Sequence, residues 1–234
     1  MALPKLASAK YELTLPSTGE KVEYRPFLVR EEKILLLAQQ SGDQKDILRA
    51  VEEIVSACTF EKLNSKKLPF FDLEYVFLQL RSKSIGEKTQ ISVICPDDKT
   101  TRVSVEVDLA TIECTKELGH DSNIKLTDTI GIIMDYPRVT SMISMDGLGD
   151  TEAAFSVIKS CIKQIYDADN FYDAVDMDKT ELDEFVGSMT HQQFEKVQEF
   201  FATMPKVKKL LKVKNPNTGV ESEVLLEGLN AFFQ

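Results

Sequence analysis

Three short turns constrain the fold of this chain more than any other feature. They lie at residues 16–19, 96–99 and 215–219, and each contains two or more of proline, glycine, asparagine and aspartate. Side chains alternate in character on both sides of each turn, which is typical of two antiparallel strands joined as a β-hairpin. Because the strands come in adjacent pairs between helix-like segments, the sequence predicts an α+β fold and not a parallel βαβ sheet.

Amphipathic helices are predicted between the hairpins. The clearest begins at Asp43 and places apolar residues at steps of three and four from Ile47 to Cys58. Similar patterns cover 29–38, 72–80, 150–165, 180–189 and 190–201, with Asp72 and Thr190 as predicted helix caps and Thr180 as the predicted start of a helix. Isolated helices of this length are marginal in water, so they must pack together. The predicted fold is therefore a helical body with three antiparallel β-hairpins.

The order of these patterns divides the chain into four segments. Residues 1–86 form an N-terminal hairpin plus helices, and 87–146 a hairpin followed by an irregular region of mixed period. Residues 147–204 are predicted to be helical, and 205–234 form a C-terminal hairpin and apolar tail. A chain of 234 residues can bury a sizeable core, so we expect one compact or bilobed unit.

The charge balance narrows the classes of partner. The net charge of −10 creates a field that repels phosphate backbones and anionic lipids, so neither nucleic-acid binding nor a membrane-surface role is expected. Apolar runs are only a few residues long, whereas a membrane-spanning helix needs about 20. The first residues lack an apolar signal core, and we expect a cytoplasmic site of action.

Cysteine and histidine provide little for catalysis. The four cysteines are widely spaced, so we expect reduced thiols, with Cys58 and Cys161 buried in helices as small hydrophobic residues. The two histidines, His120 and His191, lie in ordinary surface contexts without a nucleophile at defined spacing. We therefore predict no catalytic residue, no cofactor and no enzymatic activity.

The acidic segment 167–178 begins like an EF-hand calcium loop, since Asp167 and Asp169 occupy its first and third positions. Its sixth residue is Tyr172, where the sharp turn needs glycine, and its twelfth is Asp178 in place of glutamate. We interpret the segment as a solvated acidic loop or a patch that faces a partner, and assign no metal site. Whether it holds any cation stays open. A hydrolase would have to use carboxylates of this loop, namely Asp167, Asp169, Asp173 and Asp176.

Two features near the C-terminus are candidate partner contacts. Lysines alternate along the strand that begins at residue 206, either as a solvated edge that discourages aggregation or as a surface for an acidic partner. The apolar tail can pack on its own body or anchor in another subunit. The predicted partner-binding residues are Lys206, Lys208, Lys212, Leu229, Phe232 and Phe233.

Both ends of the chain resemble baseplate hub proteins of T-even-type bacteriophages. The similarity is strongest in the segments 3–5, 11–19, 24–27 and 31–38, and again in 201–205 and 225–233. Some members of that family carry cysteine pairs in the two later hairpins that look like zinc-ribbon knuckles. Here Cys95 lacks a second cysteine and the turn at Asn215 has none, so those hairpins resemble zinc ribbons without a complete ligand set.

The resemblance implies a late viral product that helps to build the baseplate hub in the host cytoplasm. Other baseplate hub proteins are the expected partners, and a homo-oligomer stays open. The chain would act by transient protein–protein binding, as an assembly chaperone. The alternative is a permanent minor structural subunit of the virion baseplate. Abundant charge on the predicted helices favours the chaperone, because releasable interfaces are smaller and more polar than permanent ones.

Overall fold

The computed structural model describes residues 6–144 and 149–232, and its α+β composition confirms the predicted fold class. The chain divides into two compact units. Unit 1 comprises Met1–Thr115 together with Lys206–Gln234, and unit 2 comprises Lys116–Pro205. Of the four predicted segments, unit 1 contains the first (1–86), the start of the second (87–115) and nearly all of the last (206–234). Unit 2 contains the end of the second segment and the whole of the third.

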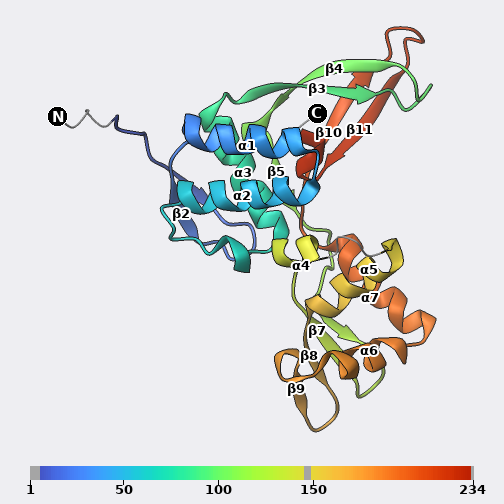
Figure 1. Cartoon of the computed structure of the whole chain (residues 1–234). Helices are drawn as coiled ribbons and strands as arrows, with labels where there is room; N and C mark the ends of the chain where they lie inside the picture. Colours follow the sequence, from blue (N-terminus) through green and yellow to red (C-terminus); the bar gives the residue numbers. More distant parts are fainter. Residues whose placement is uncertain (1–5, 145–148, 233–234) are drawn as a thin grey trace, which may run out of the picture. The chain divides into compact units, whose positions relative to one another are not determined.

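The N-terminal part of unit 1 is a hairpin followed by three helices, as predicted (Figure 1). The hairpin pairs β1 (Tyr11–Thr14) with β2 (Lys21–Tyr24). The helices are α1 (Val29–Ser41), α2 (Gln44–Cys58) and α3 (Phe70–Ser84), with a 3-10 turn η1 (Ser65–Lys67) before the last. Helix α2 packs against both α1 and α3.

Local chemistry explains where α1 ends and α2 begins. Gly42 adopts a φ of 70°, a left-handed conformation that glycine accepts without steric cost and that ends α1. The Asp43 carboxylate then accepts a hydrogen bond from the Lys45 N–H and caps α2, as predicted. The stripe of α2 forms part of the core, where Ile54 and Cys58 are fully buried.

The prediction that Asp72 caps α3 is wrong. The helix begins two residues earlier, after Pro69, and Asp72 lies inside it with no exposed surface. Its carboxylate accepts hydrogen bonds from the backbone N–H and the hydroxyl of Ser17, in the turn of the first hairpin. Asp72 therefore connects α3 to the turn of the first hairpin instead of capping the helix. A buried carboxylate needs hydrogen-bond donors, and here Ser17 provides them.

Two further hairpins complete unit 1 and confirm the prediction. One pairs β3 (Lys88–Ile94) with β4 (Arg102–Asp108), and the other pairs β10 (Lys206–Lys214) with β11 (Glu221–Glu227). A 3-10 turn η2 (Leu109–Thr111) follows β4. Strand β5 (Glu113–Thr115), which the sequence did not predict, pairs with the start of β10 to give the order β11-β10-β5. The 3-10 turn η4 (Leu229–Phe232) follows β11.

Unit 2 contains a four-stranded antiparallel sheet of order β6-β7-β8-β9, with no counterpart among the three predicted hairpins. The strands are β6 (Asn123–Lys125), β7 (Gly131–Met134), β8 (Ile162–Tyr166) and β9 (Phe171–Asp173). The helical elements are α4 (Val139–Ser144), α5 (Asp150–Cys161), η3 (Ala174–Asp176), α6 (Lys179–Gly187) and α7 (His191–Thr203). Helix α6 begins at Lys179, one residue before the predicted start at Thr180, and Asp178 caps it, whereas Thr190 caps α7 as predicted.

The predicted helix over residues 150–165 is wrong in its last turn. Helix α5 ends at Cys161, and Ile162 and Ile165 belong to β8, which pairs with β7. Both isoleucines are buried in the core of unit 2 with Ile132 and Phe200. Isoleucine suits a strand better than a helix, and its spacing of three along this segment mimicked a helical stripe.

Candidate functional site

The predicted contact lysines lie on one face of the β10–β11 hairpin. Along β10, Val207, Leu211 and Val213 are buried on one face, and the even-numbered residues 206 to 214 lie on the opposite face. Lys206, Lys208 and Lys212 therefore share the outer face, as the alternation of a strand requires. The structure thus brings three of the six predicted contact residues together.

Glutamates of β11 balance the charge of that face. Lys206 Nζ lies 2.9 Å from Glu227 Oε1, and Lys212 stands directly opposite Glu223 in the register. Between these pairs Leu210 faces Leu225, each about half exposed. The outer face carries alternating pairs of opposite charge and little net charge. That balance favours a solvated strand over a basic surface that attracts an acidic partner.

The predicted C-terminal contacts are divided between buried and undescribed side chains. Leu229 is only 3% exposed, and its N–H donates to Glu74 Oε1 of α3 at 2.7 Å. Burial raises the pKa of Glu74 to about 7, against the opposing effect of this hydrogen bond. The start of the tail therefore packs on its own unit. Phe233 and the side chain of Phe232 lie outside the described part of the chain.

The turns of the β3–β4 and β10–β11 hairpins bind each other through hydrogen bonds. Asn215 is 1% exposed, and its Nδ2 lies 3.0 Å from both carboxylate oxygens of Asp97 and 2.9 Å from Asp98 Oδ2. Thr218 donates its hydroxyl to Asp97 Oδ2 at 2.6 Å. Hydrogen bonds from Asn215 and Thr218 hold the pKa of Asp97 below its usual range, and hydrogen bonds from Thr101, Thr100 and Asn215 lower the pKa of Asp98. We call this set of contacts the hairpin clasp.

The residues of the hairpin clasp do not fit zinc. Two residues separate Cys95 from Asp98, and two separate Asn215 from Thr218, which is the spacing of paired cysteines in a zinc ribbon. Only one of these four positions carries a thiol, and amide and hydroxyl groups are not customary zinc ligands. Across residues 6–144 and 149–232, no group of three or more histidine, cysteine or acidic side chains is placed to hold a metal ion.

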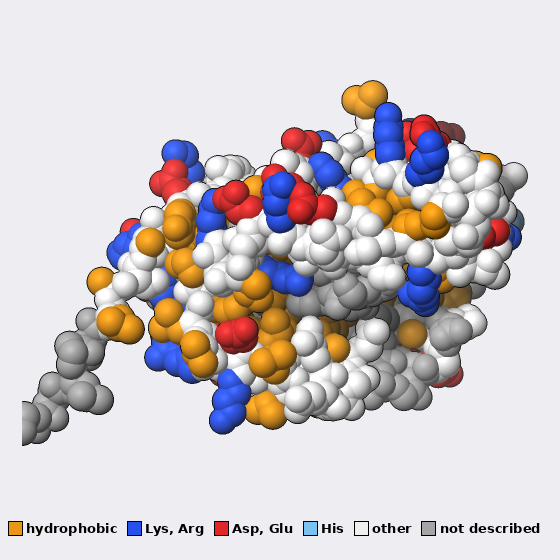
Figure 2. Space-filling model, turned by 90° about the horizontal axis from the view of Figure 1, so that it is seen from above, with side chains coloured by type: hydrophobic (Ala, Val, Ile, Leu, Met, Phe, Trp, Pro, Cys, Tyr) orange, Lys and Arg blue, Asp and Glu red, His pale blue; other side chains and the backbone are white. Residues whose placement is uncertain are grey.

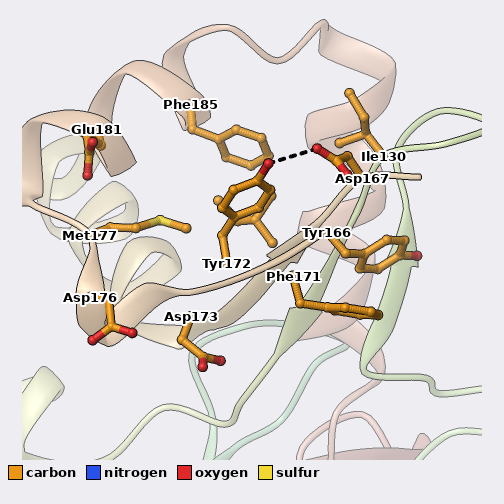
Figure 3. Close-up of a pocket in the computed structure, with 11 residues that line it drawn as sticks. Ile130, Tyr166, Asp167, Phe171, Tyr172, Asp173, Asp176, Met177, Glu181 and Phe185 are labelled. Carbon is orange, nitrogen blue, oxygen red and sulfur yellow. Dashed lines mark hydrogen bonds between the residues drawn. The ribbon is translucent and has the colours of Figure 1, made fainter. Parts of the chain in front are cut away.

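A pocket of about 650 Å³ lies in unit 2 between the β8–β9 hairpin, η3 and α6. We call it the aromatic–acidic groove. Its apolar lining consists of Ile130, Ile165, Tyr166, Phe171, Tyr172, Met177 and Phe185. Its acidic residues are Asp167, Asp173, Asp176 and Glu181. In Figure 3 Tyr172 occupies the middle of the groove beside Phe185, and Asp173 and Asp176 lie near each other along one rim. The groove thus combines an aromatic surface with carboxylates.

Two acidic residues of the predicted loop hold the local backbone. Asp167 accepts hydrogen bonds from the N–H groups of Asp169 and Asn170, both at 2.8 Å, and from the Tyr172 hydroxyl at 2.9 Å. These bonds lower the pKa of Asp167. Asp178 accepts from two N–H groups at the start of α6. The first and last positions of the calcium-like loop therefore have partners within the chain, in a turn and a helix cap.

A glycine sets the position of one groove residue. Gly131 stands opposite Tyr166 in the pairing of β7 with β8, and a Cβ atom at Gly131 would overlap the Tyr166 ring. The Tyr166 hydroxyl donates to Asn123 Oδ1 at 2.8 Å. The absence of a side chain at Gly131 thus lets the tyrosine lie across the sheet beside Phe171. This pairing could not be read from the sequence, because the period of residues 124–137 was ambiguous.

Neither histidine forms a catalytic arrangement. His120 is half-buried in unit 2, with its ring nitrogens 3.0 Å from the Thr203 hydroxyl and 3.1 Å from the Tyr136 hydroxyl. Its ring packs against Phe200, and burial lowers its pKa. The surface position predicted for His120 is therefore wrong, since its environment is an aromatic cluster. His191 is exposed and lies 3.3 Å from Glu195 on α7.

The cysteines behave as buried hydrophobic residues. Cys58 and Cys161 have no exposed surface, as predicted, and all four cysteines are free thiols. Burial raises the pKa of Cys58 to about 11 and that of Cys161 to about 12. Since the thiolate is the reactive form, these two thiols are poor nucleophiles and poor metal ligands.

Within the described ranges, every helix is too short or too polar to cross a membrane.

Comparison with known proteins identifies the family. No curated protein and no solved structure matches the chain. The family model described as T4 bacteriophage base plate protein matches residues 8–234, which is nearly the whole chain. The chain therefore belongs to the T4 bacteriophage base plate protein family.

Proposed function

We propose that this baseplate protein assists assembly of the baseplate hub by transient binding to other hub proteins in the host cytoplasm. The observation that carries the proposal is the aromatic–acidic groove, an open surface pocket with both apolar and acidic lining. Interfaces of mixed polarity and modest size suit partners that must separate again. The proposed role is that of an assembly chaperone, and it makes or breaks no covalent bond.

The charge distribution supports a protein partner. With a net charge of −10, the chain repels nucleic acid and attracts positively charged protein surfaces. The basic strand β10 does not alter this preference, because β11 places glutamates opposite its outward lysines. The acidic groove of unit 2 therefore carries the charge that a partner meets. Complementary charge speeds encounter and selects partners more than it increases final affinity, as suits a reversible assembly step.

A second candidate is a permanent structural subunit of the baseplate hub. It is favoured by apolar side chains that reach the surface of unit 1 around the start and outer face of α1. These are Leu6, Leu28, Val29, Leu36, Leu37 and Ile85, which are between 43% and 97% exposed. Figure 2 shows hydrophobic side chains at the surface near the N-terminal segment, among basic and acidic ones. Permanent interfaces are more apolar than transient ones, so this face suits a lasting contact.

Quantitative mass spectrometry of purified phage particles separates the two candidates. A chaperone is expected to be absent from the finished particle, although it is present in infected cells and in complexes with hub proteins. Co-expression with each hub protein, followed by affinity capture, should recover such a complex. Stoichiometric presence of the chain in purified baseplates would overturn the proposal in favour of the structural subunit. Failure to capture any hub protein would remove both candidates.

A further inference from the structure

The aromatic–acidic groove exposes an unusual amount of aromatic surface for its size. Phe171 and Tyr172, adjacent residues of β9, are 68% and 45% exposed, and Ile130 beside them is 37% exposed. Large apolar side chains in one concave patch are costly to leave in water and commonly mark a binding surface. Aromatic residues also contribute strongly to protein–protein interfaces.

The rim of the groove carries two exposed carboxylates, those of Asp173 and Asp176. Asp173 accepts a hydrogen bond from the neutral Gln164 side chain at 2.8 Å, and the Asp176 carboxylate lies at the surface. Within residues 6–144 and 149–232, neither carboxylate forms an ion pair with lysine or arginine. Among the residues that the structure describes, those lining the groove include no lysine, arginine or histidine. A ligand with positive charge would therefore meet unpaired carboxylates.

The sheet ends at the groove. Strand β9 is the last in the order β6-β7-β8-β9, so one side of its backbone faces away from the sheet. An extended peptide can align with such an edge and direct alternate side chains to the same face. On the other side of the groove, Phe185 of α6 and Met177 provide apolar contacts.

We infer that the aromatic–acidic groove binds a short, extended segment of a partner protein in which apolar residues alternate with lysine or arginine. The apolar side chains contact Phe171, Tyr172 and Phe185, and the cations pair with Asp173 and Asp176. Charge complementarity selects this occupant, because an acidic peptide or a nucleic acid would be repelled by the same rim. The inference deepens the proposed function and rests on it for the biological role of the partner.

The probe is a short fluorescent peptide in which leucine and lysine alternate, measured by fluorescence anisotropy with the full chain. Asp173→Asn combined with Asp176→Asn should weaken its binding by about tenfold, from the loss of two charge contacts. Phe171→Ala should also weaken binding by about tenfold, through loss of an aromatic contact. The effect of the double substitution should shrink at high salt, whereas that of Phe171→Ala should persist.

A matched variant controls for the general acidity of the chain. Asp169→Asn with Glu184→Gln also removes two exposed acidic charges of unit 2, outside the groove lining. It should bind the peptide like the unsubstituted chain. Equal weakening by the two double variants, or equal binding of a leucine–glutamate peptide, would overturn the inference. No binding of the leucine–lysine peptide would also overturn it. Circular dichroism melting curves establish that each variant is folded.

Further results separate a failure of the inferred peptide binding from a failure of the proposed chaperone role. If the groove variants still capture hub proteins while peptide binding is lost, the groove is not the site that serves assembly and the inference is overturned. If sedimentation shows a concentration-dependent dimer that Phe171→Ala abolishes, a second copy of this chain is the occupant instead. Presence of the chain in finished baseplates would refute the chaperone role, yet leave peptide binding by the groove as measured.

Discussion

The buried acidic side chains of unit 1 and the acidic side chains at the groove rim of unit 2 serve opposite purposes. In unit 1, Glu31, Asp72 and Glu74 are at most 5% exposed, and each accepts hydrogen bonds from residues of other elements or of its own helix start. In unit 2, Asp173 and Asp176 stand at the rim of an open groove. The buried acids connect parts of the fold, whereas the exposed acids are available to a partner. Substitution should therefore affect stability in unit 1 and binding in unit 2.

The largest effect is expected at the buried ion pair of unit 1. Arg25 Nη2 lies 2.9 Å from Glu31 Oε1, and both side chains are at most 10% exposed. Arg25→Ala would leave the Glu31 carboxylate buried with a lost partner, so we expect the free energy of unfolding to fall by about 3–5 kcal/mol. Urea denaturation followed by circular dichroism would measure it.

A neighbouring arginine is the control for this substitution. Arg30 also contacts Glu31, at 2.7 Å from its Nε, but its side chain is 71% exposed. Solvent screens such a contact, so Arg30→Ala should cost less than about 1 kcal/mol. Equal losses for the two arginines would show that burial does not set the strength of these contacts. The contrast between the two units would then lose its physical basis.

The ion pair should also respond to acid. Burial alone would raise the pKa of Glu31, but hydrogen bonds from Arg25, Arg30 and the Leu28 N–H bring it to about 2. Because the folded pKa lies below the unfolded value of 4.5, this contribution is full above pH 4.5. It is lost as the pH falls towards 2. Acid titration should therefore unfold Arg25→Ala at a higher pH than the unsubstituted chain.

Glu74 should show the opposite dependence on pH. Its folded pKa of about 7 lies above the ordinary glutamate value of 4.5, because burial disfavours the ionised form in the folded state. The stability that protonated Glu74 contributes is complete below pH 4.5 and is lost as the pH rises through about 7. Glu74→Gln keeps an acceptor for the Leu229 N–H and cannot ionise. It should raise the free energy of unfolding at pH 8.5 by on the order of 2–3 kcal/mol.

Denaturation at two pH values tests this expectation. At pH 4.5 the variant and the unsubstituted chain should unfold with closely similar free energies, since Glu74 is protonated in both the folded and much of the unfolded state. A gain at pH 4.5 as large as that at pH 8.5 would mean that packing of the amide, and not ionisation, is responsible. The buried carboxylate would then not be a pH-dependent element of unit 1.

The hairpin clasp should give an intermediate effect. Asn215→Ala removes the amide that bonds to Asp97 and Asp98, and we expect a loss of about 1.5–3 kcal/mol, as for hydrogen bonds to charged groups. Hydrogen exchange at the β3–β4 and β10–β11 turns should speed up locally. Asn217→Ala is the control, because Asn217 donates to Thr101 from an exposed position and its loss should cost less. Equal losses in the free energy of unfolding for the two variants would show that the buried Asn215 amide does not contribute more to the hairpin clasp than the exposed Asn217 amide.

The sequence predicted local structure well where a turn or a cap determines it. The hairpins around residues 16–19, 96–99 and 215–219 follow from turn chemistry alone, as does the start of α2 at Asp43. It failed where tertiary contacts override local preference. Aspartate is a common helix cap, but Asp72 accepts hydrogen bonds from the distant Ser17. Ile162 continues the helical spacing of the preceding residues, but it belongs to strand β8 of the sheet.

The groove could be predicted only in part. The sequence predicts a solvated loop or a patch for a partner over the acidic segment 167–178, and six of its residues line the groove, among them the acidic Asp167, Asp173 and Asp176. Its apolar side was missed, because Ile130, Ile165 and Phe185 lie outside that segment and only the folded unit brings them together with it. Conversely, the lysines of β10 looked like a basic patch until their cross-strand glutamates were located.

The smallest effect on stability is expected at the rim of the groove. Substituting its exposed acids tests whether they, unlike the buried acids of unit 1, are dispensable for folding. Asp173 and Asp176 are exposed, and asparagine can still accept the hydrogen bond from Gln164. Removing both charges should change the free energy of unfolding by less than about 0.5 kcal/mol, as at surface sites without special contacts. Urea denaturation measures it beside the peptide assay. A loss as large as that of Arg25→Ala would mean that these acids hold unit 2 together. Loss of peptide binding without loss of stability would place them on the surface that meets a partner.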